Sequence, residues 1–149
     1  MSIGSICNHS VATISSDAGI VEAARRMREE HVGDLVVVEL RGGITVPIGI
    51  VTDRDIVVSV VAKQVSPADL TVADVMSSSL LKVNEQSGVE HALQEMHRGG
   101  VRRAPVVGAR GELVGILSVD DVIERLAAQL DHVAGLIHAE QQREVRVRP

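Results

Sequence analysis

Apolar residues along the chain form one helical stripe in each half. Within each stripe they occupy positions i, i+3, i+4 and i+7, which is typical of an amphipathic helix that packs on a core. Ser87 and Glu90 have the spacing of a capping box, so the second of these helices is expected to begin at Ser87. The stripes consist of Ile20, Ala23, Ala24 and Met27 in the first half and of Val89, Ala92, Leu93 and Met96 in the second.

Short apolar runs surround each helix and predict three strands in each half. A further segment follows the third strand. Residues 55–63 are rich in β-branched side chains and fit either a strand or a helix, whereas residues 120–130 have helical spacing. We predict a helix for both, because the two halves follow the same order. The predicted strands cover residues 11–14, 34–39 and 47–51, then 80–83, 104–108 and 113–117.

The two halves are an internal repeat, which decides the fold prediction. A shift of 69 residues pairs Gly19, Ala23, Met27, Val32, Val37 and Val38 with identical residues, and a shift of 66 does the same for Gly49, Ile50 and Asp55. The predicted fold class is α+β, with two β-α-β-β-α repeats that pack through their sheets as one pseudo-symmetric unit. We expect repeat 1 at 6–65, a linker near 64–70, repeat 2 at 71–129, and a C-terminal helix extension with a basic tail at 130–149.

The last predicted helix carries an apolar seam with alternating spacings of three and four. This heptad spacing fits a helix that lies on its own core, and it fits a contact with a second copy of the chain. The first-half helix ends near Lys63 and has no such extension, so we favour a homodimer. The seam consists of Ile123, Leu126, Leu130, Val133 and Ile137.

Composition excludes several function classes. The 149 residues are 45% hydrophobic and 23% charged, with a formal net charge of −5, so binding to nucleic acid or to an anionic membrane is not expected. The chain has no Phe, Tyr or Trp, so a base cannot stack on an aromatic side chain. No apolar run reaches the roughly 18 residues of a membrane span. One cysteine and no signal peptide indicate a cytoplasmic protein.

A polar cluster follows the third predicted strand in both repeats. Thr52 to Asp55 and Ser118 to Asp121 share the pattern of a hydroxyl residue with an acid three positions later, which is a common helix cap. The same arrangement could hold a ligand, because a hydroxyl at a helix start can donate to phosphate and a carboxylate can accept from ribose hydroxyls. The pattern alone leaves both interpretations open.

The doubled β-α-β-β-α order with the sequence Gly-apolar-apolar-[Ser/Thr]-x-x-Asp resembles the cystathionine-β-synthase (CBS) domain family in its tandem form, the Bateman module. The resemblance covers about residues 6–129, including "TVADVM" and "GVRRAPVV". It implies a stand-alone regulatory sensor that binds an adenine nucleotide (AMP, ADP or ATP), or else NAD or S-adenosyl methionine, in a cleft between the repeats. It also implies a homodimer, with a regulated protein that the sequence does not identify.

The family's roles carry over to both motifs, with Thr52 and Ser118 on phosphate and Asp55 and Asp121 on ribose. Asp120 adds negative charge at the second motif, so we expect weaker binding of charged phosphates there and a larger loss from Asp55→Ala than from Asp121→Ala. Arg102 and Arg103 could offset that charge. The expected ligand-binding residues are Ile50, Thr52, Asp53, Arg54, Asp55, Arg102, Arg103, Ile116, Ser118, Asp120 and Asp121.

Two other chemistries have weaker support. Cys7 and His9 form a Cys-x-His pair, but no second pair of ligands at a suitable spacing accompanies them, so no metal site is expected. Asp53, Asp55, Asp120 and Asp121 could form paired carboxylates, but the sequence offers no fixed nucleophile and no group that would raise their pKa values. We therefore expect no catalytic activity. A structural or protein-interaction module is the alternative to the sensor.

Overall fold

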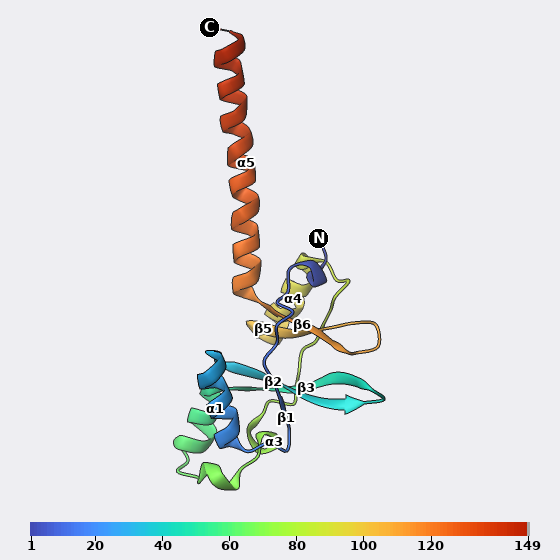
Figure 1. Cartoon of the computed structure of the whole chain (residues 1–149), viewed down its shortest axis with the longest axis vertical. Helices are drawn as coiled ribbons and strands as arrows, with labels where there is room; N and C mark the ends of the chain where they lie inside the picture. Colours follow the sequence, from blue (N-terminus) through green and yellow to red (C-terminus); the bar gives the residue numbers. More distant parts are fainter. Residues whose placement is uncertain (149) are drawn as a thin grey trace.

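The computed structural model describes residues 1–148 and confirms the doubled order of elements. The long C-terminal helix projects from a body that contains both repeats (Figure 1). Pro149, the last residue of the expected basic tail, lies outside the described residues. Repeat 1 comprises β1 (Thr13–Ser15), α1 (Ile20–Glu30), β2 (Asp34–Arg41), β3 (Ile44–Thr52), α2 (Asp53–Ile56) and a π-helical turn (Val57–Val61), and repeat 2 comprises β4 (Val83–Asn84), α4 (Val89–Gly99), β5 (Arg103–Val107), β6 (Leu113–Ser118) and α5 (Val119–Val147).

The segment that could have been a strand or a helix is helical, as the repeat predicted. It begins as α2 and continues directly into the π-helical turn. Three short elements lie outside the repeated pattern. They are two 3-10 turns, Ile3–Ser5 and Pro67–Asp69, and the helix α3, Val72–Val75.

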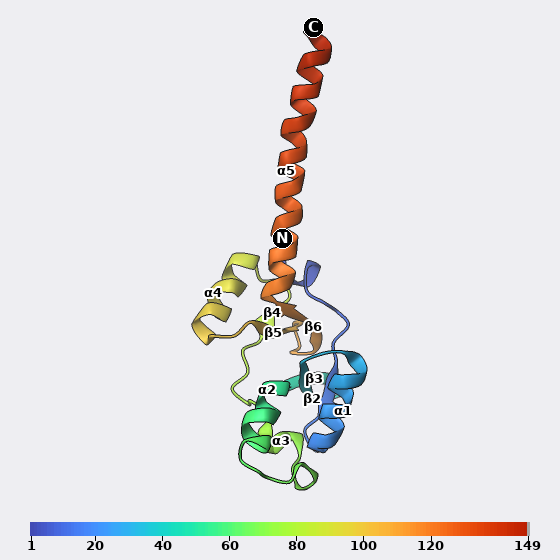
Figure 2. The same ribbon diagram turned by 90° about the vertical axis from the view of Figure 1, so that its left-hand side faces the viewer.

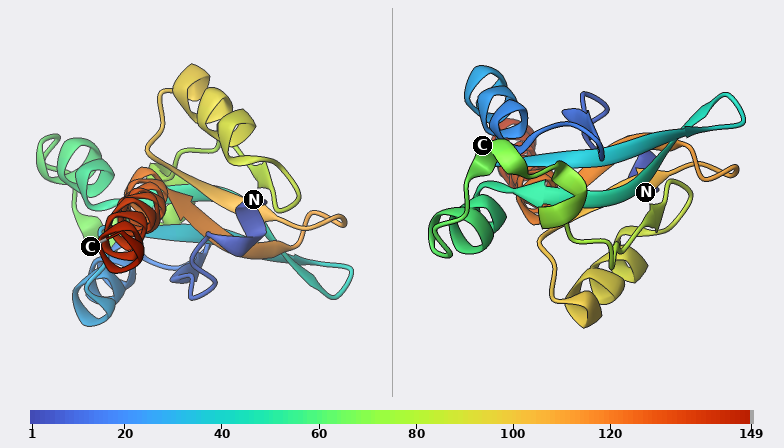
Figure 3. Two further views of the ribbon diagram at one scale, coloured as in Figure 1. Left: turned by 90° about the horizontal axis from the view of Figure 1, so that it is seen from above. Right: turned by 90° about the horizontal axis from the view of Figure 1, so that it is seen from below.

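Each repeat contains a three-stranded sheet with the same topology. In repeat 1, β1 pairs with β2 in parallel and β2 pairs with β3 in antiparallel orientation, and β4, β5 and β6 repeat this arrangement. The register shifts at Val37/Val38 in one sheet and at Val106/Val107 in the other. Figures 1 and 2 show the two sheets next to each other in the middle of the body, with α1, α2 and α3 on one side and α4 on the other. The strands of both sheets run across the body beneath α5 when the molecule is seen from its end (Figure 3).

The segment before each repeat packs on the other repeat. Ile3 and Cys7 belong to the hydrophobic core of repeat 2, and Val72 belongs to that of repeat 1. Backbone hydrogen bonds fix both crossings. The Asn8 and Ile116 amides donate to each other's carbonyl oxygens at 2.9 Å, and Ser77 pairs with Ile50 in the same way at 2.9 and 3.2 Å. The chain therefore ties its two cores together by exchanging these leading segments.

These crossings explain the glycine that opens each motif. A Cβ atom on Gly115 would lie 2.7 Å from Cys7 Sγ and 2.8 Å from the Asn8 carbonyl oxygen. A Cβ atom on Gly49 would lie 2.8 Å from both Met76 Sδ and the Ser77 carbonyl oxygen. Only glycine leaves room for a backbone to approach the strand this closely.

The ends of the first helix in each repeat are also equivalent. α1 ends at His31 and α4 ends at Gly100, both in the left-handed conformation, with φ of 55° and 63°. The capping box that we predicted from Ser87 and Glu90 was wrong, because the residue that caps α4 is Gly88, which has no side chain to bond the helix amides. The N–H of Ser87 instead donates to the Asn84 carbonyl oxygen in a turn.

Helix α5 extends well beyond the body. Its apolar seam is exposed, with 69% of Leu130 and 54% of Val133 accessible to solvent. The interpretation of the seam as a face that packs on the chain's own core was therefore wrong, and the homodimer stays a prediction. Among residues 1–148 no helix combines the length and the apolar character needed to cross a membrane.

Candidate functional site

Both motifs form the helix caps that their spacing predicts. The Asp55 N–H donates to Thr52 Oγ1 at 3.0 Å, and the Thr52 N–H donates to Asp55 Oδ2 at 2.9 Å. Ser118 and Asp121 repeat this exchange at 3.1 and 2.8 Å. The cap does not exclude a ligand, because within residues 1–148 the second carboxylate oxygen, Oδ1, accepts no hydrogen bond in either aspartate.

The two motifs differ in the donors that they leave available. Ser118 Oγ donates to Asp121 Oδ2 at 2.6 Å, whereas Thr52 Oγ1 acts only as an acceptor in its cap. At the first motif the Asp53 N–H donates to the Gly33 carbonyl oxygen at 2.9 Å, and the Arg54 N–H donates to Asp53 Oδ1 at 2.7 Å. The first-turn amides of α2 are thus satisfied within the chain.

A cavity of about 220 Å³ lies between the two repeats and reaches the second motif. It brings together four residues of the predicted set: Arg103, Ile116, Ser118 and Asp121. Five of its lining residues are aliphatic and six are polar or charged. The full lining consists of Asn8, Ser10, Val11, Ala12, Val32, Asp34, Val36, Arg103, Ile116, Ser118 and Asp121.

The remaining predicted residues do not line this cavity. The residues of the first motif lie at the end of β3 and in α2, and Arg102 and Asp120 form a loose ion pair at 3.7 Å with both side chains largely exposed. The cavity therefore gathers residues of the expected set from repeat 2 alone, and not all of those. The residues outside the cavity are Ile50, Thr52, Asp53, Arg54, Asp55, Arg102 and Asp120.

Asp34 is the charged residue of the cavity that the sequence did not single out. Its carboxylate forms an ion pair with Arg103, and its side chain is only 10% exposed. The two residues lie 69 positions apart and are therefore equivalent under the repeat. The sequence signal that could have identified Asp34 is the occurrence of opposite charges at equivalent positions of the two repeats. In the sheets Asp34 is opposite Thr52 and Arg103 is opposite Ser118, so the ion pair lies between the two motifs.

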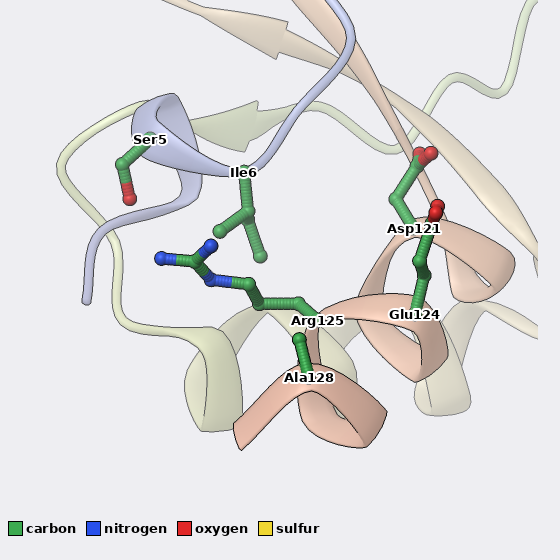
Figure 4. Close-up of a pocket in the computed structure, with 6 residues that line it drawn as sticks. All are labelled: Ser5, Ile6, Asp121, Glu124, Arg125 and Ala128. Atoms are coloured by element: carbon green, nitrogen blue, oxygen red, sulfur yellow. The ribbon is translucent and has the colours of Figure 1, made fainter. Parts of the chain in front are cut away.

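A second hollow, of about 340 Å³, lies on the other side of Asp121. Figure 4 shows the carboxylates of Asp121 and Glu124 close together, with Arg125 extending toward Ser5 and Ile6. Two carboxylates one helical turn apart do not form a metal site by themselves. No group of three or more metal-ligating side chains occurs in the part of the chain that the structure describes.

Cys7 lies in the hydrophobic core of repeat 2. Its side chain is buried against Gly115, and burial raises the pKa of the thiol above its ordinary value, with smaller contributions from the charges of Asp121 and Glu85. A raised pKa leaves less thiolate at neutral pH, so this environment makes Cys7 a poor nucleophile.

Comparison with known proteins identifies the family. The CBS domain model matches residues 3–62 and 72–128. The CBS domain-containing protein YhcV of Bacillus subtilis is 38% identical over 112 residues, which are 75% of this chain and 76% of that protein. An uncharacterised protein of Methanopyrus kandleri is 35% identical over 83% of this chain, but this chain spans only 62% of it.

The fold agrees with this assignment. The solved structure of a CBS domain protein from Pyrobaculum aerophilum, complexed with AMP, superposes with a TM-score of 0.71 at 26% identity and covers 81% of this chain and 89% of that one. Both the sequence matches and the superposition span the two repeats. The chain therefore belongs to the CBS domain family and carries two copies of the domain in tandem.

Proposed function

We propose that the chain is a non-catalytic regulatory module that binds an adenosine-containing ligand in the cavity between its repeats. The observation that carries this proposal is the placement of Asp121, which lines an inter-repeat cavity together with five aliphatic residues. A concave apolar site with a few convergent polar groups is the usual form of a small-molecule site.

The geometry supports a specific division of labour. Asp121 Oδ2 is held by the cap, so Oδ1 can accept hydrogen bonds from the two ribose hydroxyls. Val36 and Ile116 offer aliphatic surface from opposite repeats for the adenine ring, which has no aromatic partner in this chain. A ligand held in this way contacts both repeats, and its binding energy stabilises their relative position.

The AMP complex of the Pyrobaculum relative supports the class of ligand. We propose an adenosine compound, with AMP, ADP, ATP, NAD and S-adenosyl methionine as the members of the class to be tested. The first motif, with Thr52 and Asp55, is a proposed second and weaker site, because the cavity described above is lined by Ser118 and Asp121 and not by Thr52 or Asp55. We therefore reverse the order expected from the sequence and propose that Asp121→Ala weakens binding more than Asp55→Ala.

A role in protein interaction is the second candidate, and the exposed seam of α5 favours it. Leu126, Leu130, Val133 and Ile137 are all about half exposed or more, and unburied apolar surface of this kind marks an interaction site. We propose that a second copy of the chain covers this seam to form a homodimer. The regulated protein and the cytoplasmic location stay predictions.

A thermal unfolding experiment tests the proposed function. The unfolding midpoint is followed by circular dichroism, since the chain has no tryptophan, with adenosine, AMP, ATP and S-adenosyl methionine each at millimolar concentration. A ligand at 100 times its dissociation constant stabilises the fold by about 2.7 kcal/mol, so at least one compound should raise the midpoint, and Asp121→Ala should reduce the increase. An unchanged midpoint with all four compounds would favour the interaction module.

A further inference from the structure

We propose that the cavity at the second motif selects adenosine compounds whose 5′ end carries no phosphate, and that Asp34 sets this preference. This inference rests on the proposed function and assigns the ligand a narrower chemical class. The predicted ligand is a nucleoside, or a derivative whose 5′ substituent is neutral or positively charged.

The first argument is the balance of charge in the cavity. Its charged lining residues are Asp34, Asp121 and Arg103. The Asp34 carboxylate forms an ion pair with the Arg103 guanidinium, which is 45% exposed. The charge that remains without an ion-pair partner is therefore the carboxylate of Asp121. A phosphate in this cavity would meet a net negative lining, and like charges repel strongly in a partly desolvated site.

The second argument is that three hydrogen-bond donors at the motif are already engaged within the chain. Ser118 Oγ donates to Asp121 Oδ2 at 2.6 Å, and the Asp121 N–H donates back to Ser118 Oγ at 3.1 Å. The N–H of Val119 donates to the Arg102 carbonyl oxygen at 3.0 Å. Among the groups that would hold a phosphate at the start of a helix, these three are already engaged.

Binding of a ligand phosphate by Arg103 would be unfavourable. The guanidinium would have to leave Asp34, whose side chain is 10% exposed, and removing one partner of a poorly solvated ion pair leaves an uncompensated charge. Arg102 does not line the cavity, and its exposed side chain lies beside the carboxylate of Asp120. The two arginines expected from the sequence to offset the negative charge of the second motif are thus each paired with an acid.

The size of the cavity points in the same direction. Its volume of about 220 Å³ is below the range of roughly 300–1,000 Å³ that is usual for sites of drug-sized ligands. A nucleoside needs less of this space than a nucleoside triphosphate does.

Isothermal titration calorimetry in magnesium-free, low-salt buffer tests the proposal on the whole chain. The ligands are adenosine, AMP and ATP, and the variants are Asp34→Asn and the matched control Asp120→Asn, which removes the same charge from an exposed ion pair. The wild type should bind adenosine most tightly and ATP at least about tenfold more weakly, a difference of about 1.4 kcal/mol. Asp34→Asn should raise the affinity for AMP relative to that for adenosine by about tenfold, and Asp120→Asn should raise this ratio by less than about twofold.

A second variant, Arg103→Met, tests the same proposal if Asp34→Asn does not fold. Arg103→Met leaves the Asp34 charge in place and should lower the affinity for AMP about tenfold more than it lowers the affinity for adenosine. ATP binding to the wild type as tightly as adenosine, or an unchanged AMP-to-adenosine ratio in Asp34→Asn and Arg103→Met, would overturn the selectivity and leave the proposed function standing. No binding of any adenosine compound would overturn both.

Discussion

Asp34 and Arg103 occupy the same position in the two repeats and form an ion pair with each other. Each is also opposite the hydroxyl residue of its own repeat's motif, Thr52 or Ser118. The ion pair therefore connects repeat 1 to repeat 2 through side chains at equivalent positions. A contact at this point links the relative position of the repeats to the cavity beside it.

A double-mutant cycle measures this link. For Asp34→Ala, Arg103→Ala and the double variant, we expect a coupling of about 1 kcal/mol in the free energy of unfolding, because the pair is partly shielded from water. The Arg102–Asp120 pair is the control, with side chains 82% and 69% exposed. Its coupling should be close to zero in urea unfolding. Equal couplings for the two pairs would show that burial does not distinguish them.

Gly115→Ala should destabilise the protein by about 1–3 kcal/mol, since its Cβ atom would collide with Cys7 and Asn8 of the crossing segment. Gly135→Ala is the control, because nothing lies within 4 Å of a Cβ atom there, and it should be neutral or stabilising. Chemical denaturation of both variants checks the expectation. A Gly115→Ala variant as stable as the wild type would mean that the segment moves aside at little cost.

His31→Gly should stabilise the protein by about 0.5–1 kcal/mol. His31 ends α1 at φ 55°, where Gly100 ends α4 in the other repeat, and a side chain is unfavourable in this conformation. The converse change, Gly100→Ala, should destabilise by about 1 kcal/mol. Thermal unfolding of the two single variants provides the comparison, and shifts of the same sign would contradict this explanation.

Charged residues in the seam of α5 should dissociate the proposed homodimer. Leu130→Glu with Val133→Glu places two carboxylates on the exposed apolar face, where a partner helix could not solvate them. His132→Glu with Ala139→Glu adds the same side chains on the opposite face of α5 as a control. Sedimentation velocity should report a monomer for the first pair only. An assembly state that neither pair alters would mean that the seam is not the dimer contact.

The sequence predicted the fold well because, where a segment of one repeat was ambiguous, the equivalent segment of the other repeat showed its secondary structure. The valine-rich segment after Thr52 is helical, as its counterpart after Ser118 required. The crossing segments were not predicted, since Ile3 and Cys7 carry no signal that they pack on residues more than 80 positions away. The predicted capping box at Ser87 was wrong because Gly88 occupies the N-cap position of α4, and no side chain there bonds the first amides of the helix.

The candidate site was only half predictable. Ser118 and Asp121 were expected as site residues from the motif and its resemblance to the CBS domain family, and both line the cavity. Asp34 was missed because an acid at the start of a strand has no local pattern that marks it as a site residue. Its role depends on a residue 69 positions away, and only the arrangement of the two sheets brings them together.

The crystal structure of the protein soaked with adenosine tests the central claim most directly. Our account predicts the nucleoside in the cavity between the repeats, with adenine against Val36 and Ile116 and both ribose hydroxyls within hydrogen-bonding distance of the Asp121 carboxylate. An empty cavity at saturating adenosine, or adenosine bound elsewhere with Asp121 facing solvent, would contradict it.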